Sequence, residues 1–434
     1  MAYCGRKIIQ MNEDFLHFLW KNKLFSMPLT ECYSGKNIEV LSPGQHNSDQ
    51  GPDFFNARIK IGETLWAGNV EIHMRASDWL RHKHQDDEAY NSVILHVVGD
   101  NDAKICNQSG TLIPATEISC PKPLLEQYLF LMQTDKWLPC QSYISKIDQF
   151  IMMQWCEALA VERIGDKTKT IATNLQLTKN NWEESFYYTV AQAFGLKVNA
   201  QPFLMLAQSV PLTVLAHHKN SLLQIEALLF GQSGLLPDTP TDEYTQLLHR
   251  EYAHLRLKYS LEPIERQTWK FARMRPVNFP TIRIAQFASL IFKSSALLSK
   301  LVECQSIDEV KKLFSASVSD YWLTHYNFGK ESEKRGKNFG DSTLNLLIIN
   351  AFVPFMFYYG KAISKPELTE RAVAWLEQLP AEENNIIAQW RQFEVKATCA
   401  LESQALIQLY NCYCQHRQCL KCRIGRQVLS PIVR

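Results

Sequence analysis

The sequence lacks a strong net charge, an apolar leader and any apolar run long enough to span a membrane. Its 46 Lys and Arg nearly balance 44 Asp and Glu, so bulk charge neither requires nor excludes a polyanionic partner. The amino-terminal residues contain no continuous apolar stretch, so we expect a cytoplasmic protein. The most apolar run, residues 344–360, is shorter than the ~20 residues of a spanning helix and contains Asn345, Asn350 and Pro354. It predicts a buried core helix and no membrane partner.

Fixed-period repeats and low-complexity tracts are also absent, so we expect ordinary globular domains. A chain of 434 residues, 46% of them hydrophobic, has room for two or three domains with a sizeable core. Charge is uneven along it. Residues 1–130 carry 12 Lys and Arg against 16 Asp and Glu, and the rest carries 34 against 28. An acidic front end therefore precedes a basic back end.

The twelve cysteines do not predict a disulfide framework, because a cytosolic compartment keeps thiols reduced. Most of them are expected to be small buried hydrophobic residues. The exception is "NCYCQHRQCLKCRIG", where four cysteines lie close together: Cys412, Cys414, Cys419 and Cys422. Thiolates in such a cluster suit Zn²⁺ or an iron–sulfur cluster, and buried structural thiols are the alternative. Cys140, near the expected domain junction, is the best distant candidate to complete a metal-binding set.

The first part of the chain has the pattern of an α/β domain. Residues 12–25 place apolar side chains at helical spacing, with Asn12 as a cap and Glu13 in the first turn. Short alternating or continuously apolar runs follow, separated by turn residues. They cover residues 37–42, 54–61, 65–74, 92–100 and 112–119. The segment 77–91 between two of these strands is most simply a crossover helix. The prediction is an α/β domain over residues 1–124.

Beyond residue 125 the pattern changes to long segments of 3.6-residue period. They include "FIMMQWCEALAVERIGDKTKTIATNL", "NWEESFYYTVAQAF" and "TIRIAQFASLIFKSSALLSKLV". We therefore predict a large all-helical domain over residues 125–434, with residues 329–342 as a flexible loop.

One short stretch, "GPDFFNARIKIGETLWAGNVEIH", holds the candidate catalytic residues. Successive strand residues point to opposite faces, so Glu71 and His73 share one face of their strand. If residues 54–61 pair with this strand, Asp53 at the strand mouth comes within reach of Glu71. Two carboxylates held in this way form a site for Mg²⁺ or Mn²⁺. Such an ion lowers the pKa of a bound water and neutralises charge on a phosphate oxygen.

Two other interpretations of these residues stay open. The alternating strand can simply show its polar face to water, with Gly51-Pro52-Asp53 as a turn. Histidines nearby could instead build a zinc hydrolase from His73, His84 and His96 with a carboxylate, although no recognised zinc-hydrolase spacing is present. "HKHQDDE" also places His82 and His84 four residues before Asp86 and Glu88, which a solvated helix face would explain equally well.

The pairing of Pro52-Asp53 with Glu71-Ile72-His73 resembles the PD-(D/E)xK nuclease superfamily. In that superfamily an aspartate and a Glu-x-Lys element on adjacent strands bind metal and phosphodiester. The resemblance implies a restriction-endonuclease-like fold, and it implies that Glu13 could supply a third carboxylate. The departure is His73 where lysine is usual, because histidine is close to half neutral at physiological pH. Either His73 does the same work in its charged form, or hydrolysis has been lost.

A basic stretch in the helical part is the candidate nucleic-acid interface. Residues 256–283 carry seven Lys and Arg against two Glu, with Trp269, Phe271 and Phe279 among them. Residues 411–434 add five more Lys and Arg and no acid. Such charge binds backbone phosphates and aromatic rings stack on bases, although a solvated basic face with core aromatics is the alternative. The candidate contacts are Lys270, Arg273, Arg275 and Arg283.

As a whole the chain resembles a bacterial family known as domain of unknown function 2851. The stretches that carry the resemblance include "PGQHNSDQGPDFFNARIKIG", "WAGNVEIHMRASDW", "LLQIEALLFGQSGLL" and "CLKCRIG". The resemblance brings no established activity. It implies a thiol set of Cys140 with Cys414, Cys419 and Cys422, and it leaves Cys412 outside.

Together these features predict a metal-dependent nuclease, acting on DNA or RNA, or its inactive descendant. Asp53 and Glu71 would hold the metal, and His73 would orient water or the phosphate. The alternative from another class is a non-catalytic nucleic-acid-binding or scaffold protein that keeps only the ancestry of a nuclease.

Overall fold

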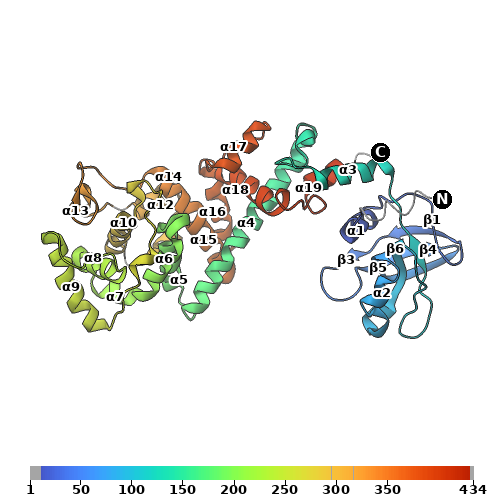
Figure 1. Ribbon diagram of the computed structural model, residues 1–434, viewed down its shortest axis with the longest axis horizontal. Coiled ribbons are helices and arrows are strands. Elements are labelled where there is room, and N and C mark those ends of the chain that lie inside the picture. The colour runs from blue at the N-terminus through green and yellow to red at the C-terminus, as the bar shows by residue number, and fades with distance from the viewer. Residues whose placement is uncertain (1–10, 295, 316, 431–434) are drawn as a thin grey trace. The chain divides into compact units, whose positions relative to one another are not determined.

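The computed structural model describes residues 11–294, 296–315 and 317–430, and the protein has two compact units (Figure 1). The first, here called the sheet unit, runs to Trp155 and also contains the chain from Leu409 onward. The second, the helical unit, is Cys156–Gln408. The chain is therefore a mixed α and β protein with an N-terminal sheet and a large helical region. The first unit thus includes the C-terminal segment as well as residues up to 155, and the predicted domain boundary at 124 stays a prediction.

The sheet unit begins with helix α1 (Glu13–Asn22), as the sequence predicts. The side chain of Asn12 accepts a hydrogen bond from the backbone N–H of Phe15, which caps the helix. Apolar residues recur on one face and are buried, with Phe15 and Trp20 fully inaccessible. The ring of Phe15 stacks on that of Tyr128 with 3.9 Å between centroids. Helix α1 is thus held between the sheet and helix α3 (Lys122–Gln133).

The sheet has seven strands in the order β1-β2-β4-β5-β6-β7, and β3 also pairs with β4. Strands β2, β4 and β5 are antiparallel neighbours, whereas β5, β6 and β7 run parallel. The central strands β4 and β6 are largely buried, as their apolar runs predict. The strands are β1 (Leu29–Thr30), β2 (Asn37–Ser42), β3 (Gln45–His46), β4 (Phe54–Ile61), β5 (Thr64–Arg75), β6 (Val93–Asp100) and β7 (Ala115–Glu117).

The connection from β5 to β6 differs from the single crossover helix that we predicted. It consists of the short helix α2 (Asp78–Arg81) and two 3-10 helices, η2 (His84–Asp86) and η3 (Glu88–Ser92). The helix stops because Lys83 takes a left-handed conformation, with φ of 62°, which reverses the chain. The i,i+4 pairs that we expected on one helix face therefore do not form, and the histidines of this segment turn toward the sheet.

The sheet unit is completed by the segment that follows α3 and by the C-terminal segment. The 3-10 helix η4 (Gln141–Lys146) and the first residues of α4 (Gln149–Leu177) follow α3. The π-helical segment η8 (Leu409–Cys414) and helix α19 (Arg423–Leu429) return to it from the C-terminal part. The ring of Trp137 stacks on Tyr410 at 4.4 Å, so the junction and the C-terminal segment are packed together.

The helical unit is not purely helical, because a small antiparallel hairpin of β8 (His325–Asn327) and β9 (Lys330–Glu331) lies within it. The start of the expected loop at 329–342 is thus part of a hairpin. The helices of the helical unit that follow α4 are α5 (Trp182–Phe194), α6 (Leu196–Ser209), α7 (Leu212–His217), α8 (Leu222–Gln232), α9 (Glu243–Tyr259), η5 (Arg266–Thr268), η6 (Pro276–Asn278), α10 (Pro280–Lys293), α11 (Leu297–Glu303), α12 (Ile307–Phe314), α13 (Asp320–Thr324), α14 (Asp341–Leu347), η7 (Ile348–Phe352), α15 (Val353–Ala362), α16 (Pro366–Gln378), α17 (Asn385–Gln392) and α18 (Ala400–Gln408).

The most apolar run of the sequence lies in the continuous helical stretch Asp341–Ala362, formed by α14, η7 and α15. By length and composition alone it could cross a membrane, and 67% of its apolar window is buried inside the protein. The ring centroid of Phe352, in this stretch, lies 3.9 Å from that of Phe314 on α12. The stretch packs as a core helix of the helical unit.

Glu226 on α8 is a carboxyl group in the core of the helical unit, with 2% of its surface exposed. Its Oε1 accepts a hydrogen bond from Ser319 Oγ at 2.7 Å, and the Tyr244 hydroxyl also contacts it. Trp322 Nε1 donates to that hydroxyl at 3.1 Å. Burial raises the pKa of Glu226 to about 7, because the low-dielectric core disfavours the charged form.

We predict that Glu226→Gln flattens the pH dependence of stability. The folded chain keeps a proton on Glu226 that the unfolded chain has lost, so the unfolding free energy falls as pH rises from 4.5 to about 7. The variant should gain up to about 3 kcal/mol over the wild type across this range. Urea unfolding at pH 4.5 and 7.5 measures it, with the exposed Glu262→Gln as control. Parallel curves for Glu226→Gln and wild type would contradict the assignment.

Candidate metal centre and active site

The carboxylates of Asp53 and Glu71 each accept a hydrogen bond from the backbone of the other segment, across the antiparallel pair β4 and β5. Phe54 faces Val70 in the register of these strands, which brings the preceding Asp53 beside the following Glu71. Glu71 Oε2 accepts a hydrogen bond from the backbone N–H of Asp53 at 3.0 Å. In return, Asp53 Oδ2 accepts from the backbone N–H of Ile72 at 2.9 Å. The structure therefore brings both carboxylates to the same side of the sheet.

The charges around Asp53 and Glu71 favour the binding of a cation. Glu71 is only 4% exposed, and burial, followed by the charges of Asp53 and Glu13, raises its pKa to about 9. His17 on α1 places Nε2 at 3.2 Å from Asp53 Oδ2. Although burial alone lowers the pKa of His17, the contact with Asp53 raises it above its ordinary value. One imidazole thus shares its charge among several acidic groups, and a divalent ion would balance the rest.

Three histidines complete a compact set of ligand atoms around Glu71. Glu71 Oε1 lies 3.4 Å from His84 Nε2 and 3.6 Å from His73 Nε2. His82 Nδ1 lies 3.2 Å from the same His73 nitrogen. Ligand atoms of His73, His82 and His84 all lie within 4.8 Å of one another. Imidazole nitrogen with carboxylate oxygen is the donor set of zinc, manganese and iron sites.

His96 on β6 lies behind His73 and fixes its ring. Its Nε2 is 2.9 Å from His73 Nδ1, and β5 and β6 pair directly at this level. Burial and neighbouring imidazoles lower the pKa of His73 to about 2 and that of His96 to about 3. Both rings are therefore neutral at physiological pH. Neutral His73 suits metal ligation through Nε2 with its proton on Nδ1, and it does not supply the permanent charge of a lysine.

Aromatic side chains wall the histidine cluster. Tyr90 stacks on His84 with 3.8 Å between ring centroids, and Trp79 meets the rings of His84 and His96 edge-on at 5.4 and 5.3 Å. Trp79 and Tyr90 belong to a buried apolar cluster with Val93. This wall lowers the local dielectric and limits the rotation of the imidazoles, which strengthens electrostatic contacts inside the site.

Glu13 lies at the solvent side of the same cluster. It is half-buried on the first turn of α1, and burial raises its pKa despite the opposing charge of His17. With Asp78 and Arg81 it lines a surface cavity of about 410 Å³. The third carboxylate that the resemblance suggested is therefore close enough to act on Asp53 and Glu71 electrostatically, and it faces solvent.

A second cavity of about 410 Å³ adjoins the site through His17 and is here called the basic pocket. Four Lys and Arg line it against one carboxylate, Asp14. Burial and the charge of Arg426 lower the pKa of Lys21, so two cations lie side by side. The cationic lining residues are Lys21 on α1 and Arg417, Lys421 and Arg426 from the C-terminal segment.

The basic residues predicted from segment 256–283 are divided by burial. Lys270, Arg273 and Arg275 are exposed on the helical unit. Arg283 is 3% exposed, and its guanidinium donates to Gln286 Oε1 and to Asn278 Oδ1. Trp269 is also buried, and its Nε1 donates to the carbonyl of Ser233 at 2.8 Å. Arg283 and Trp269 are thus inaccessible to a nucleic-acid strand, and the three exposed cations stay candidates.

The structure brings together Cys140, Cys414, Cys419 and Cys422, all buried in the sheet unit. Burial, followed by the neighbouring Cys422 and Cys419 thiols, raises the pKa of Cys140 to about 12. Cys414 lies close enough to the other three to be affected in the same direction. Cys412, by contrast, is exposed.

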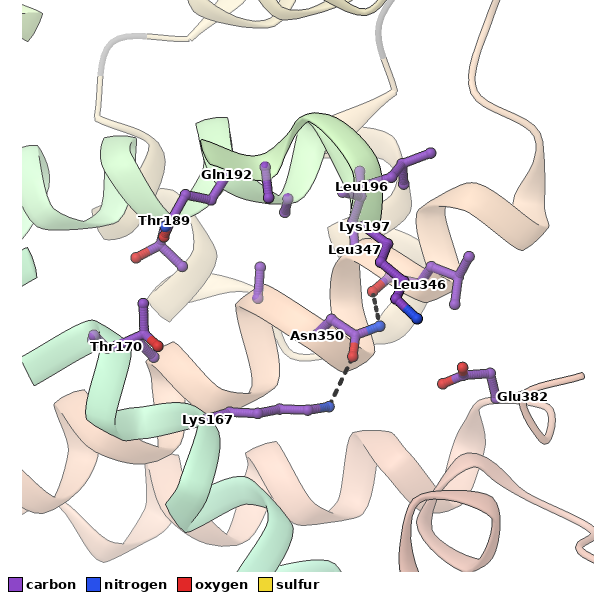
Figure 2. Close-up of a pocket in the computed structure, with 14 residues that line it drawn as sticks. Lys167, Thr170, Thr189, Gln192, Leu196, Lys197, Leu346, Leu347, Asn350 and Glu382 are labelled. Carbon is purple, nitrogen blue, oxygen red and sulfur yellow. Dashed lines mark hydrogen bonds between the residues drawn. The ribbon is translucent and has the colours of Figure 1, made fainter. Parts of the chain in front are cut away.

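The helical unit contains a larger cavity of about 590 Å³ (Figure 2). Figure 2 shows Lys167 pointing toward Asn350, to which it donates at 2.9 Å. Lys167 also donates to Gln404 Oε1 at 2.7 Å, and burial lowers its pKa to about 7. The Lys167 amino group thus already donates hydrogen bonds to acceptors within the protein. The lining is mainly apolar and contains neither histidine nor cysteine, so the cavity offers less chemistry than the carboxylate and histidine cluster.

Several site residues escaped the sequence interpretation. His17 was not considered, although it follows Glu13 by four residues on a helix and so shares its face. His82 was assigned to a solvated helix face. It is exposed, but its Nδ1 lies 3.2 Å from His73 Nε2, a contact that depends on the chain reversal at Lys83. Trp79 and Tyr90 gave no signal beyond their apolar character.

A family model described as "Protein of unknown function (DUF2851)" matches residues 13–385. The match includes the carboxylate and histidine cluster and most of the helical unit, and it ends before Cys414. Curated proteins and solved structures give no significant match.

We predict that the cluster binds Mn²⁺, an ion that the thiol set should not compete for because thiolates prefer softer metals. Glu71→Gln should weaken Mn²⁺ binding by more than tenfold. His96→Leu, which removes the support behind His73, should weaken it by about 10- to 100-fold. Calorimetric titration of chelator-treated protein measures both, with the exposed His217→Ala as control. Equal affinities in Glu71→Gln and wild type would remove the site.

Proposed function

We propose that the chain, which belongs to the DUF2851 family, is a metal-dependent nuclease whose active site is the carboxylate and histidine cluster. One observation carries the proposal. Asp53 accepts a hydrogen bond from the backbone N–H of Ile72 at 2.9 Å, and Glu71 accepts one from that of Asp53 at 3.0 Å, so both carboxylates are oriented before any ion binds. Preorganised oxygen ligands of this kind are what a hydrolytic metal site requires.

The order of elements supports a restriction-endonuclease-like core. Helix α1 is followed by the antiparallel strands β2, β4 and β5, then by the short helix α2 and the parallel strand β6. This is the order that the PD-(D/E)xK resemblance implies, with Asp53 and Glu71 on neighbouring strands. The short crossover and His73 in place of lysine are the departures.

The donor set favours a transition metal over Mg²⁺. Magnesium prefers oxygen ligands and retained waters, whereas this cluster adds imidazole nitrogens of His73 and His84 to the carboxylates. Mn²⁺ fits a mixed oxygen and nitrogen set, and Zn²⁺ fits it as well. When bound, a divalent cation supplies Lewis acidity toward water and toward a phosphate oxygen.

The surrounding residues have separate tasks in this proposal. Glu71 and Asp53 hold the ion, and His96 is a positioning residue that orients His73. His17 holds Asp53 in place by its contact at 3.2 Å. Glu13, at the solvent side, is placed to accept a proton from an attacking water. Trp79 keeps bulk water away from the inner side of the histidines.

A phosphodiester substrate is favoured by the basic pocket. Its clustered cations adjoin the metal ligands through His17, so a backbone phosphate bound there would be directed toward the carboxylates. Phosphate groups release counterions when Lys and Arg neutralise them, which is the main source of affinity for nucleic acid. The exposed Lys270, Arg273 and Arg275 could bind further along a strand.

A non-catalytic nucleic-acid-binding protein is the second candidate, and the state of His73 favours it. His73 is 2% exposed and neutral, so it places no fixed positive charge beside a phosphate. In this alternative the basic pocket would bind nucleic acid without hydrolysis.

Cleavage separates the two candidates. With Mn²⁺, the purified protein should cleave at least one of single-stranded DNA, duplex DNA and RNA, and Glu71→Gln should reduce the rate by more than 100-fold. The loss follows because one metal ligand disappears while the fold is kept. The matched control is Glu88→Gln, an exposed acid in the connection between β5 and β6. Binding of nucleic acid without cleavage in every metal would support the second candidate instead.

The basic pocket makes its own prediction. Lys421→Gln should lower affinity for duplex DNA and reduce the slope of log K against log salt by about 0.9, because one phosphate contact is lost. Mn²⁺ affinity should be unchanged, since Lys421 does not contact the metal ligands. Fluorescence anisotropy without divalent metal measures the slope, and the exposed Lys330→Gln serves as control. An unaltered salt slope in Lys421→Gln would exclude the pocket as the binding surface.

A further inference from the structure

We propose that Cys140, Cys414, Cys419 and Cys422 bind an iron–sulfur cluster that fixes the C-terminal segment to the sheet unit. The four thiols come from two regions far apart in the chain and meet inside one unit. Each is 6 or 7% exposed. None is in a disulfide. This inference is independent of the nuclease proposal, because it concerns other residues and another ligand chemistry.

Donors around the thiols are arranged for sulfur that carries negative charge. Backbone N–H groups of Ile424 and Gly425 donate to the Cys422 sulfur. The indole N–H of Trp155 is buried without a hydrogen-bond partner among the described residues, and it lies close enough to Cys422 to act on the thiol. The positive charge of Arg417 acts on Cys414 and Cys419. Hydrogen bonds and charges of this kind stabilise metal-bound thiolates and set the potential of iron–sulfur clusters.

The backbone between the cysteines is shaped to present them inward. Arg417 has φ of 55°, and its guanidinium donates to the carbonyls of Thr134 and Cys414 at 2.6 and 3.2 Å. This joins the turn to the end of α3. A Cβ at Gly425 would lie 2.1 Å from the carbonyl oxygen of Cys419, so only glycine permits the approach. This close approach keeps the turn between Cys419 and Cys422 tight, which suits thiols that share one ligand.

The spacing of the thiols favours a cluster over a single zinc ion. Tetrahedral zinc with Zn–S bonds of about 2.3 Å would hold its sulfurs about 3.8 Å apart. Among the described residues, the group whose ligand atoms all lie within 4.8 Å of one another consists of histidines, and the cysteines form no such group. A four-iron cluster has an iron at each of four corners and therefore holds its thiolates further apart than one ion can.

The cluster would also build one wall of the basic pocket. Lys421 lies between two of the ligands, and Arg426 lies four residues after the last of them. Arg426 Nε donates to the carbonyl of Leu420 at 3.0 Å, so its position depends on the turn that the cysteines hold. Loss of the cluster should therefore loosen these cations while leaving the carboxylate and histidine cluster in place.

Anaerobic purification with metal and sulfide analysis tests the inference. We expect about four iron and four acid-labile sulfide per chain, with a broad visible absorption that dithionite bleaches. Cys422→Ser and Cys140→Ser should each lower the iron content by more than half. The matched control is Cys412→Ser, an exposed thiol in the same segment, which should keep its iron. Glu71→Gln should keep its iron too, even if the nuclease proposal fails.

Two results would overturn the inference. One is zinc in place of iron and sulfide in wild-type protein, which would assign the four thiols to a single ion. The other is iron that is present in Cys140→Ser and Cys422→Ser at the wild-type level. Circular dichroism of both variants checks that the helical unit stays folded, so that a lost cluster is not confused with a lost fold. Retained helicity with lost iron supports the proposal.

Discussion

The reciprocal hydrogen bonds between the start of β4 and the end of β5 are the constraint on which the candidate site depends. They exist only because Phe54 faces Val70 in this register. A slip of one residue would send Glu71 and His73 to the other face of the sheet. The sheet therefore holds two carboxylates together that repel each other in the low-dielectric interior, and the surrounding imidazoles follow from that arrangement. An ion between them would relieve the repulsion that the strand register imposes.

Residues on regular strands were the predictable part of this site. Period-two alternation identifies Glu71 and His73 as sharing a face, and the pairing of adjacent strands brings Asp53 to them. Helix α1 was also predictable, because the Asn12 cap and the helical spacing of the apolar residues both indicate the same helix. His84 was named as a possible zinc ligand, but its approach and that of His82 to His73 were not predictable. Both depend on the left-handed turn at Lys83, and its effect on the chain direction depends on tertiary contacts that no local pattern encodes.

Burial limited the interpretation of charge in the helical part. Arg283 and Trp269 belong to a basic, aromatic stretch whose composition is the same whether its side chains face solvent or the core. In the structure both side chains are buried and donate hydrogen bonds to other residues of the protein. The sequence also did not show that the C-terminal segment belongs to the sheet unit. The return of the C-terminal segment to the sheet unit depends on contacts over more than 250 residues, such as that between Arg417 and Thr134, and periodicity carries no information about them.

The two candidate metal sites of the sheet unit differ in the hardness of their ligands. Oxygen and imidazole nitrogen around Glu71 suit Mn²⁺ or Zn²⁺, whereas thiolates around Cys422 suit iron–sulfur chemistry. The basic pocket touches both, since His17 contacts Asp53 on one side and Lys421 follows Cys419 on the other. A polyanion bound in this pocket would lie between the proposed thiol centre and the carboxylates of the proposed metal site. Ligand type alone therefore allows one small unit to hold two different metals in fixed positions.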